Sequence, residues 1–219
     1  MIALDFAPVL AEWPALAKGL GLTVVLTAVS AVLGVSLGIV CACVRAYGSQ
    51  FGKMWVAAYV ELIRNTPFIV QLFFIFFGLP SLGVKLSPEL ASVIAMVVNL
   101  GAYSTEIVRA GLEATPKGMW DAAKSLALNK RQILRLVVLP PALKSIWPAM
   151  VGQIIIVMLG SAVCGQISAQ ELSYVANLIH SRNFRAFEAT MIAAAMYLAL
   201  AMLVRQLLMW LGPRYVYKH

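Results

Sequence analysis

Two long stretches of this sequence contain no charged residue, residues 19–44 and residues 145–170. A helix rises about 1.5 Å per residue and the hydrocarbon core of a bilayer is about 30 Å thick, so roughly 20 apolar residues suffice to cross it. Only 12% of the chain is charged, whereas soluble domains average roughly 25%. The two stretches therefore predict an all-α membrane protein, because a segment in lipid must satisfy its backbone hydrogen bonds internally.

Three further apolar segments extend this prediction to five spans. The five lie at about residues 19–44, 54–79, 90–111, 145–168 and 187–211. Together they form one transmembrane domain, residues 19–211, between an N-terminal segment, residues 1–18, and a tail, residues 212–219. The N-terminal segment contains acidic residues and lacks a basic leader, so we do not expect a cleaved signal peptide.

The distribution of basic residues indicates an orientation. With five spans, 13 of the 17 Lys and Arg residues lie on the same side of the membrane as residues 113–144, and four lie on the other side. Cytoplasmic loops of membrane proteins are enriched in Lys and Arg. We therefore expect the N-terminus outside and the C-terminus inside. The same rule accounts for the net charge of +8 without a nucleic-acid partner.

Residues 113–144 form the one long polar interruption, with six basic and two acidic side chains. Small or apolar residues recur in it at helical spacing over residues 122–127 and 133–138. We expect two short helices joined at residues 128–129 and lying outside the membrane, with the second ended by Pro140-Pro141. Because two-turn helices are barely stable alone, this segment should need a partner surface.

Two charged residues lie in the first half of the second predicted span. Glu61 and Arg64 are three residues apart and can pair on one helical face, either to hold the helix at the membrane interface or to steady a gate. Pro67 should kink the helix, because proline removes a backbone donor. Gln71 follows one turn later, where it could face a pore.

The third predicted span carries a polar stripe. Asn99, Tyr103 and Glu106 are spaced so that they share one helical face. Polar side chains in a span normally face the bundle interior or a water-filled path. The stripe therefore predicts either the lining of a solute path or hydrogen bonds between helices.

The sequence lacks the motifs of common enzymes. It contains no G-x-x-x-x-G-K-[ST] loop, no zinc-ligand spacing, and no Ser or Cys nucleophile with a His and carboxylate partner. We expect no enzymatic activity, no metal and no cofactor in this chain. Cys41, Cys43 and Cys164 should be small buried side chains in apolar runs. Residues 170–188 should form an exposed connection in which His180 is solvated.

Part of the polar segment resembles a known signature. Asp121-Ala122-Ala123, Ala127 and Leu139-Pro140 fall where the cytoplasmic coupling loop of ATP-binding-cassette (ABC) importer permeases has Glu-Ala-Ala, a glycine and Leu-Pro. Residues 21–39, 61–80 and 99–123 resemble the polar-amino-acid uptake branch of that family, and the resemblance runs from about Gly19 to the C-terminus. Asp at 121 and Ala at 127 are mild departures, which could loosen the turn without abolishing docking.

The resemblance implies the type I ABC importer permease fold, with five spans and a cytoplasmic two-helix coupling loop over residues 113–144. It implies a bacterial inner-membrane subunit of an ATP-driven, binding-protein-dependent amino-acid importer, acting as a homodimer or heterodimer. ATP and Mg²⁺ would be bound by separate ATPase subunits. A periplasmic or lipid-anchored binding protein would dock on the outer loops, residues 80–88 and 168–186.

The resemblance also implies which residues couple the chain to an ATPase. Ala122, Ala123 and Leu126 would dock into a groove on that subunit, with Lys124 and Arg131 at the polar rim. The full set of expected coupling residues is Asp121, Ala122, Ala123, Lys124, Leu126, Ala127, Arg131 and Pro140.

The fourth predicted span departs from the related permeases, which usually carry an Asn-Gln or Asn-Glu pair and then a Lys-Asp-Thr-Ser-like cluster. Here the chain reads Gly152-Gln153 and Leu159-Gly160-Ser161-Ala162. The missing acidic residue in the pair leans away from a cationic amino acid as solute. The lost cluster leaves an alternative open, namely a structural or regulatory subunit whose sister permease alone binds solute. A stand-alone secondary transporter suits five spans without internal repeats poorly.

Two sets of residues are therefore expected to serve transport. The candidates for the substrate pathway are Gln71, Asn99, Tyr103, Glu106, Gln153 and Ser161, and the candidates for a gate or a structural role are Glu61, Arg64 and Pro67.

Overall fold

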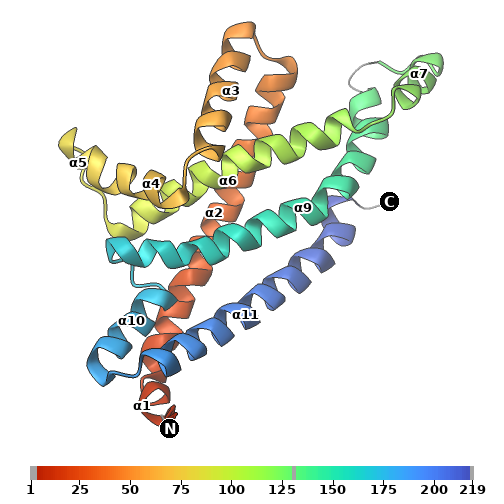
Figure 1. Ribbon diagram of the computed structural model, residues 1–219. Coiled ribbons are helices and arrows are strands. Elements are labelled where there is room, and N and C mark those ends of the chain that lie inside the picture. The colour runs from red at the N-terminus through yellow and green to blue at the C-terminus, as the bar shows by residue number, and fades with distance from the viewer. Residues whose placement is uncertain (1–3, 130–131, 218–219) are drawn as a thin grey trace.

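The computed structural model describes residues 4–129 and 132–217, and within these ranges the chain is helical, with no strand (Figure 1). The all-α fold expected from the sequence is confirmed. The helices are α1 (Ala7–Leu10), α2 (Trp13–Tyr47), α3 (Gln50–Arg64), α4 (Phe68–Phe73), the π-helix η1 (Phe74–Gly78), α5 (Leu79–Ser81), α6 (Pro88–Glu113), α7 (Lys117–Ser125), the π-helix η2 (Ile133–Val138), α9 (Leu139–Gly160), the 3₁₀ helix η3 (Ser161–Ile167), α10 (Leu172–Asn183), α11 (Ala186–Leu211) and the π-helix η4 (Gly212–Val216).

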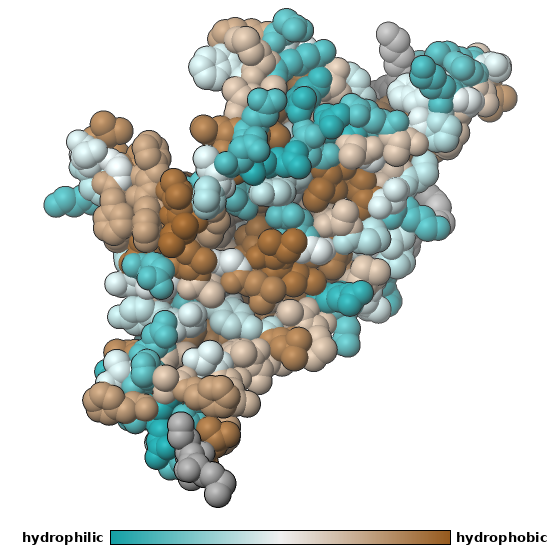
Figure 2. Space-filling view, viewed as in Figure 1, coloured by the Kyte–Doolittle hydropathy of each residue, from teal (hydrophilic) through white to brown (hydrophobic). Residues whose placement is uncertain are grey.

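The long helices α6, α9 and α11 run side by side, and α2 crosses them (Figure 1). Four helical stretches in the described part of the chain are long and apolar enough to cross a membrane, and a bent pair, α3 with α4–α5, makes a fifth if it is counted as one span. The four are Trp13–Tyr47, Pro88–Glu113, Ile133–Ile167 and Ala186–Val216. Figure 2 shows hydrophobic side chains over α4 and the middle of the bundle, with hydrophilic ones near α3, α7 and α10.

The second predicted span is broken rather than merely kinked. The axes of α3 and of α4–α5 differ by 110°. Asn65 and Thr66 turn their side chains back to carbonyls of the last turn of α3, at 2.8 Å each, and so satisfy acceptors that a continuing helix would use. Pro67 follows with an extended backbone. The predicted kink is thus confirmed, and side-chain capping enlarges it to a break.

Small residues set the contact between α2 and α6. Ser30, Gly34 and Gly38 lie on one face of α2 and are buried. A Cβ added at Gly34 would lie 2.8 Å from the Cβ of Leu100, and one added at Gly38 would overlap Ser104. The stripe therefore packs on α6, because only residues without bulky side chains permit so close an approach.

The connection before α11 was expected to be exposed, and this expectation is wrong. Residues 172–183 form α10, whose apolar face packs against the start of α2 and of α11. Glu171 precedes this helix and is fully buried. Its carboxylate accepts hydrogen bonds from the amides of Ser173 and Tyr174, at 2.9 and 2.7 Å, and from the hydroxyl of Tyr197. Burial raises the pKa of this carboxyl.

His180 is likewise not a solvated loop residue. It lies on α10, and its Nδ1 atom is buried without a hydrogen-bond partner among the described residues. An apolar helical face at residues 172, 175, 176 and 179 was present in the sequence, but the mixed charges around it obscured it.

The expectation that Pro140 and Pro141 end a helix is also wrong. Residues 133–138 form the π-helix η2, and α9 begins at Leu139 without a break, so the helical stretch runs to Ile167. The prolines occupy the first turn of α9, where a missing backbone donor costs little. The wider π-turn before them accommodates the rings, so the expected second short helix of the polar segment is continuous with the helix of the fourth predicted span.

The turn after α7 contains a strained residue. Ala127 has a φ of 58°, in the left-handed region where a Cβ crowds the following carbonyl. The amide of Leu128 then donates to the carbonyl of Ala123 at 3.3 Å, closing the turn. The permeases that this chain resembles have glycine at this position. Alanine in its place strains the backbone of the turn.

Replacing Gly38 with valine should destabilise the chain by about 1–3 kcal/mol, because side chains forced into a tight contact shift their neighbours. Gly21→Val is the matched control, since a Cβ there meets nothing within 4 Å. The measurement is the melting temperature of the purified protein in detergent. Equal melting temperatures for the two variants would contradict the close α2–α6 contact.

Replacing Ala127 with glycine should stabilise the turn after α7 by about 1 kcal/mol, because glycine adopts left-handed backbone angles without strain. Hydrogen exchange of the α7 amides should slow by about fivefold, the equivalent of that energy. Ala122→Gly, in the middle of the same helix, should have the opposite effect. Faster exchange in Ala127→Gly would show that the turn is unstrained.

Candidate coupling loop and solute pathway

The coupling loop, residues 113–144, has a small apolar core of its own. Ala123 of α7 is buried with Ile133 and Val138 of η2. Half-buried side chains, among them Trp120 and Leu134, surround these three. The packing holds α7 against the start of the long α9 stretch, at the opposite end of α6 and α9 from α10 (Figure 1).

A second face of the coupling loop points outward. Ala122 is exposed, and so is Leu126, at 75% of its surface. These two residues are four apart and share one side of α7 and the turn that follows it. Asp121 and Lys124 flank them and form an exposed ion pair at 3.1 Å. The loop therefore presents a small apolar surface with a charged border.

The expected coupling residues differ in how accessible they are to a partner. Ala123 was expected to dock on a partner, but its burial in the core of the loop contradicts this expectation. Arg131 lies outside the described residues. Pro140 is half-buried in the first turn of α9, away from the outward face. Ala122 and Leu126 remain as the apolar residues that a partner can reach.

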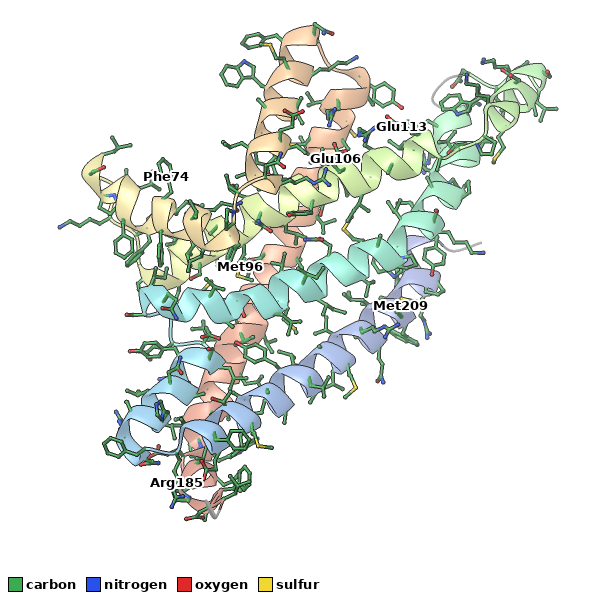
Figure 3. All side chains as sticks on the ribbon, in the orientation of Figure 1. Phe74, Met96, Glu106, Glu113, Arg185 and Met209 are labelled. Carbon is green, nitrogen blue, oxygen red and sulfur yellow. The ribbon has the colours of Figure 1, made fainter. Side chains whose placement is uncertain are left out.

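An ion cluster, formed by Arg45, Arg64, Glu106 and Arg109, joins α2, α3 and α6. Glu106 is its centre, with only 17% of its side chain exposed, and it lies where α6 passes α2 and α3 (Figure 3). Arg45 and Arg109 form ion pairs with its two oxygens, the latter at 2.8 Å, and Arg64 approaches to 3.8 Å. Three arginines thus surround one half-buried carboxylate, and opposite charges at this distance attract one another.

The expected pair between Glu61 and Arg64 does not form. Of the ion pairs within 4.0 Å among the described residues, the one made by Arg64 is with Glu106 on α6. The Arg64 guanidinium also lies over the ring of Tyr103, 5.5 Å from its centroid. The break at Pro67 sets the direction of α3 against α6, and a contact across helices replaces the contact along one helix.

The ion cluster is connected to the coupling loop. Arg109 donates to Glu106 and also to Glu113, the last residue of α6. Glu113 begins the coupling loop, so a chain of charges runs along α6 from the contact with α2 and α3 to the connection before α7.

Two buried amides form the other polar contact of the stripe. The Nδ2 atom of Asn99 donates to the Oε1 atom of Gln71 at 3.0 Å. Gln71 in turn donates to the carbonyls of Ile63 and Thr66, at 2.8 and 3.0 Å, across the break between α3 and α4. This amide pair, Gln71 and Asn99, fixes α4 on α6 and leaves the carbonyl oxygen of Asn99 available.

Asn99 also lines a hollow of about 150 Å³ between α4, α6, α9 and η3. We call it the pathway hollow. Asn99 is the only polar side chain in its lining, which consists of Phe68, Asn99, Ile156, Val157, Gly160 and Val163. Within the described residues, the lining of this hollow is therefore apolar, with one amide and no charged group.

The other pathway candidates lie elsewhere. Tyr103 and Glu106 line a second, more polar hollow of about 330 Å³ between α2, α3 and α6. Ser161 is fully buried and donates to the carbonyl of Met158 at 2.6 Å, so its hydroxyl does not face the pathway hollow. Gln153 is half-buried on α9. The structure thus brings Gln71 and Asn99 together, and separates Ser161 from both.

Sequence reasoning missed Arg45 and Arg109. Both are ordinary positive charges at the ends of spans, and nothing in the pattern says which carboxylate they meet. The one available signal was Glu106 itself, because a carboxylate in a span requires a cationic partner. Arg45 is 61 residues away from it in sequence, and only packing brings the two together.

Comparison with known proteins agrees with this geometry. The L-cystine transport system permease protein TcyB of Bacillus subtilis is 34% identical over 171 residues, which are 78% of this chain and 73% of TcyB. The arginine transport system permease protein ArtQ of the same organism is 32% identical over 204 residues, 92% of each chain. A crystal structure of an amino acid ABC transporter with histidines contains a chain that superposes with a TM-score of 0.90, at 32% identity, covering 97% of this chain and 100% of that one.

A protein family model matches most of the chain. Residues 34–217 match the family described as binding-protein-dependent transport system inner membrane component. The match includes the ion cluster, the amide pair and the entire coupling loop. This chain belongs to that family of inner-membrane transport components.

Proposed function

We propose that this chain is the permease subunit of an ATP-driven, binding-protein-dependent amino-acid importer. The single observation that carries the coupling role is the outward face of the coupling loop. Ala122 and Leu126 stay exposed although the loop has a complete apolar core of its own. An apolar surface on a charged, extramembrane element is typical of a docking site. The related permeases named for L-cystine and arginine support an amino acid as solute.

The chain supplies the membrane path and not the chemistry. ATP and Mg²⁺ are held by separate ATPase subunits, and two permease chains, identical or sister, enclose one path. Closure of the ATPase pair around ATP moves the docked coupling loops and shifts the bundles from inward-open to outward-open. The work comes from the different affinities of the two conformations for ATP. The link from Glu113 through Arg109 to Glu106 carries this movement into the bundle.

The orientation follows from the docking role. The coupling loop lies in the cytoplasm, the C-terminus is also cytoplasmic, and the N-terminus and α10 lie outside a bacterial inner membrane. The excess of basic residues on the side of the coupling loop supports this placement. The binding protein then docks over residues 80–88 and 168–186.

The pathway hollow indicates the kind of solute. Its lining offers one amide and no charge, so the described residues around this hollow provide no counter-ion for a charged side chain. A solute that passes here is best a neutral amino acid, with its backbone groups met by Asn99 or by the other permease chain. This agrees with the absence of an acidic residue at positions 152–153.

A second candidate function rests on the same hollow. Gly160 lines it and Ser161 is turned away, so little of this chain recognises polar solute groups. A sister permease would then bind the solute alone, and this chain would close the path and couple to the ATPase. The two functions differ in what substitution of Asn99 does.

Ala122→Arg should abolish co-purification of the ATPase, because a long cation on the outward face blocks docking. The measurement is affinity purification of the tagged chain in mild detergent, with mass spectrometry of the proteins that accompany it. Lys117→Gln is the control, since it is exposed on the same helix but roughly 140° away around it. A stoichiometric ATPase bound to Ala122→Arg would contradict the docking proposal.

The same experiment with Ala123→Arg should give a different result. A buried charge in the core of the loop should unfold α7 and make it sensitive to protease, whereas Ala122→Arg leaves the loop intact.

A second permease chain among the accompanying proteins would identify a heterodimer.

Asn99→Leu should change solute preference or raise the KM for import about tenfold, because it removes the one polar group of the pathway hollow. ATPase activity should stay coupled. Thr105→Ala is the control, since its hydroxyl is buried on the same helix, donates to the carbonyl of Gly101 and is absent from the lining of the pathway hollow. Unchanged solute kinetics in a stable Asn99→Leu protein would favour the second candidate function.

A further inference from the structure

The second, polar hollow lies outside the solute path that we propose. It measures about 330 Å³, near the lower end of the roughly 300–1,000 Å³ typical of small-molecule sites. It lies one helical turn from Asn99 toward the coupling loop, where α6 meets α2 and α3. Its polar lining residues are Arg45, Glu61, Arg64, Asn65, Tyr103 and Glu106.

Positive and negative groups in this hollow retain binding capacity. The side chain of Arg64 is 43% exposed, and its nearest carboxylate oxygen, on Glu106, is 3.8 Å away, beyond hydrogen-bond distance. Its planar donors can therefore grip a carboxylate in the two-pronged manner. Glu61 is exposed, and no cation of the described residues lies within 4.0 Å of its carboxylate. The two residues are three apart on α3 and face the hollow together.

Neighbouring groups orient this pair. The ring of Tyr103 lies under the Arg64 guanidinium, 5.5 Å away, and holds it over the hollow. The Nδ2 atom of Asn65 donates to the carbonyl of Glu61 at 2.8 Å, which leaves the side-chain oxygen of Asn65 as a further acceptor. The arrangement offers one carboxylate-binding fork and two acceptors for an ammonium group.

We propose that the polar hollow binds a free amino acid as its zwitterion, with the α-carboxylate on Arg64 and the ammonium group on Glu61. The inference rests on the proposed function for its ligand class and for the cytoplasmic side from which the ligand enters. A simple anion would be repelled by the carboxylates of Glu61 and Glu106, and a simple cation by the arginines. A compact ligand carrying both signs satisfies the lining.

The same charges would suit a zwitterionic lipid headgroup, but the rest of the lining does not. A lipid needs an apolar groove for its acyl chains next to the headgroup. Val60 is the only aliphatic residue in the lining of the polar hollow. The shape and polarity therefore favour a free amino acid.

Occupancy of the polar hollow has a consequence for transport. A ligand that bridges Glu61 and Arg64 fixes the end of α3 against Tyr103 and Glu106 on α6. Glu106 is connected through Arg109 and Glu113 to the coupling loop. Amino acid accumulating inside the cell would thus hold this junction still and slow further import.

The first test is binding to the full chain in nanodiscs. The probe is an equimolar mixture of the 20 common L-amino acids, and its counterpart is the same mixture with acetylated α-amino groups. We expect the free mixture alone to raise the melting temperature. Glu61→Gln and Arg64→Lys should each raise about tenfold the concentration of the mixture that gives half of the full melting-temperature shift. Glu61→Gln removes one charged contact, and Arg64→Lys removes the fork geometry. In an Asn99→Leu background, the response that remains should still be lost in Glu61→Gln and Arg64→Lys, which separates this hollow from the pathway hollow.

Each result decides the proposal. An equal response to the acetylated mixture would mean an anion site and overturn it. A bound phospholipid that Arg64→Lys releases and amino acids do not displace would overturn it in favour of a lipid. Glu61→Gln keeps the size of an exposed side chain, so loss of folding is not expected to obscure the comparison, and Arg64→Lys provides an independent variant.

The second test is import into vesicles that are either empty or preloaded with the free amino-acid mixture. Preloading should slow import by the assembled wild-type transporter, and the ratio of the two rates should approach one in Glu61→Gln. If the transporter imports no amino acid but the chain still binds the free mixture and not the acetylated one, the proposed function is contradicted and the proposed site is retained. If import is normal but there is neither selective binding nor an effect of preloading, the proposed site is contradicted and the proposed function is retained.

Discussion

The close contact between α2 and α6 positions the rest of the structure. Gly34 and Gly38 let the two backbones approach, so that Ser104 and Leu100 of α6 fill the space where side chains of α2 would be. Arg45 follows two turns after Gly38, and the contact delivers it to Glu106. In a bilayer, apolar surfaces gain nothing from hiding from water, so close packing and polar pairing must hold helices together.

The polar stripe on α6 makes contacts between helices and also lines two hollows. Asn99 bonds to Gln71 across helices and also lines the pathway hollow. Glu106 ties three helices and also lines the polar hollow. A buried polar group that is only partly satisfied by its neighbours retains capacity for a ligand, so contacts between helices are compatible with the solute path that we propose.

In the coupling loop, the residues that hold the fold differ from those that we propose for docking. Ala123 belongs to a core shared by α7 and η2, whereas Ala122 and Leu126 face outward. Because η2 continues directly into α9, the core that holds α7 is shared with the start of the long α9 stretch. The strained turn at Ala127 lies between these parts and adjusts how firmly α7 is held.

The sequence by itself determined the helical fold, the charge-free spans, the small-residue face of α2 and the change of direction at Pro67, because apolar length, residue size and proline chemistry are local properties. Tertiary structure alone decided that Glu106 meets Arg45, that Ala123 is buried, and that a helix runs through Pro140-Pro141. It also made α10 a packed helix around the buried Glu171. These outcomes depend on which surfaces meet, and contacts between residues far apart in the chain leave no periodic signal in the sequence.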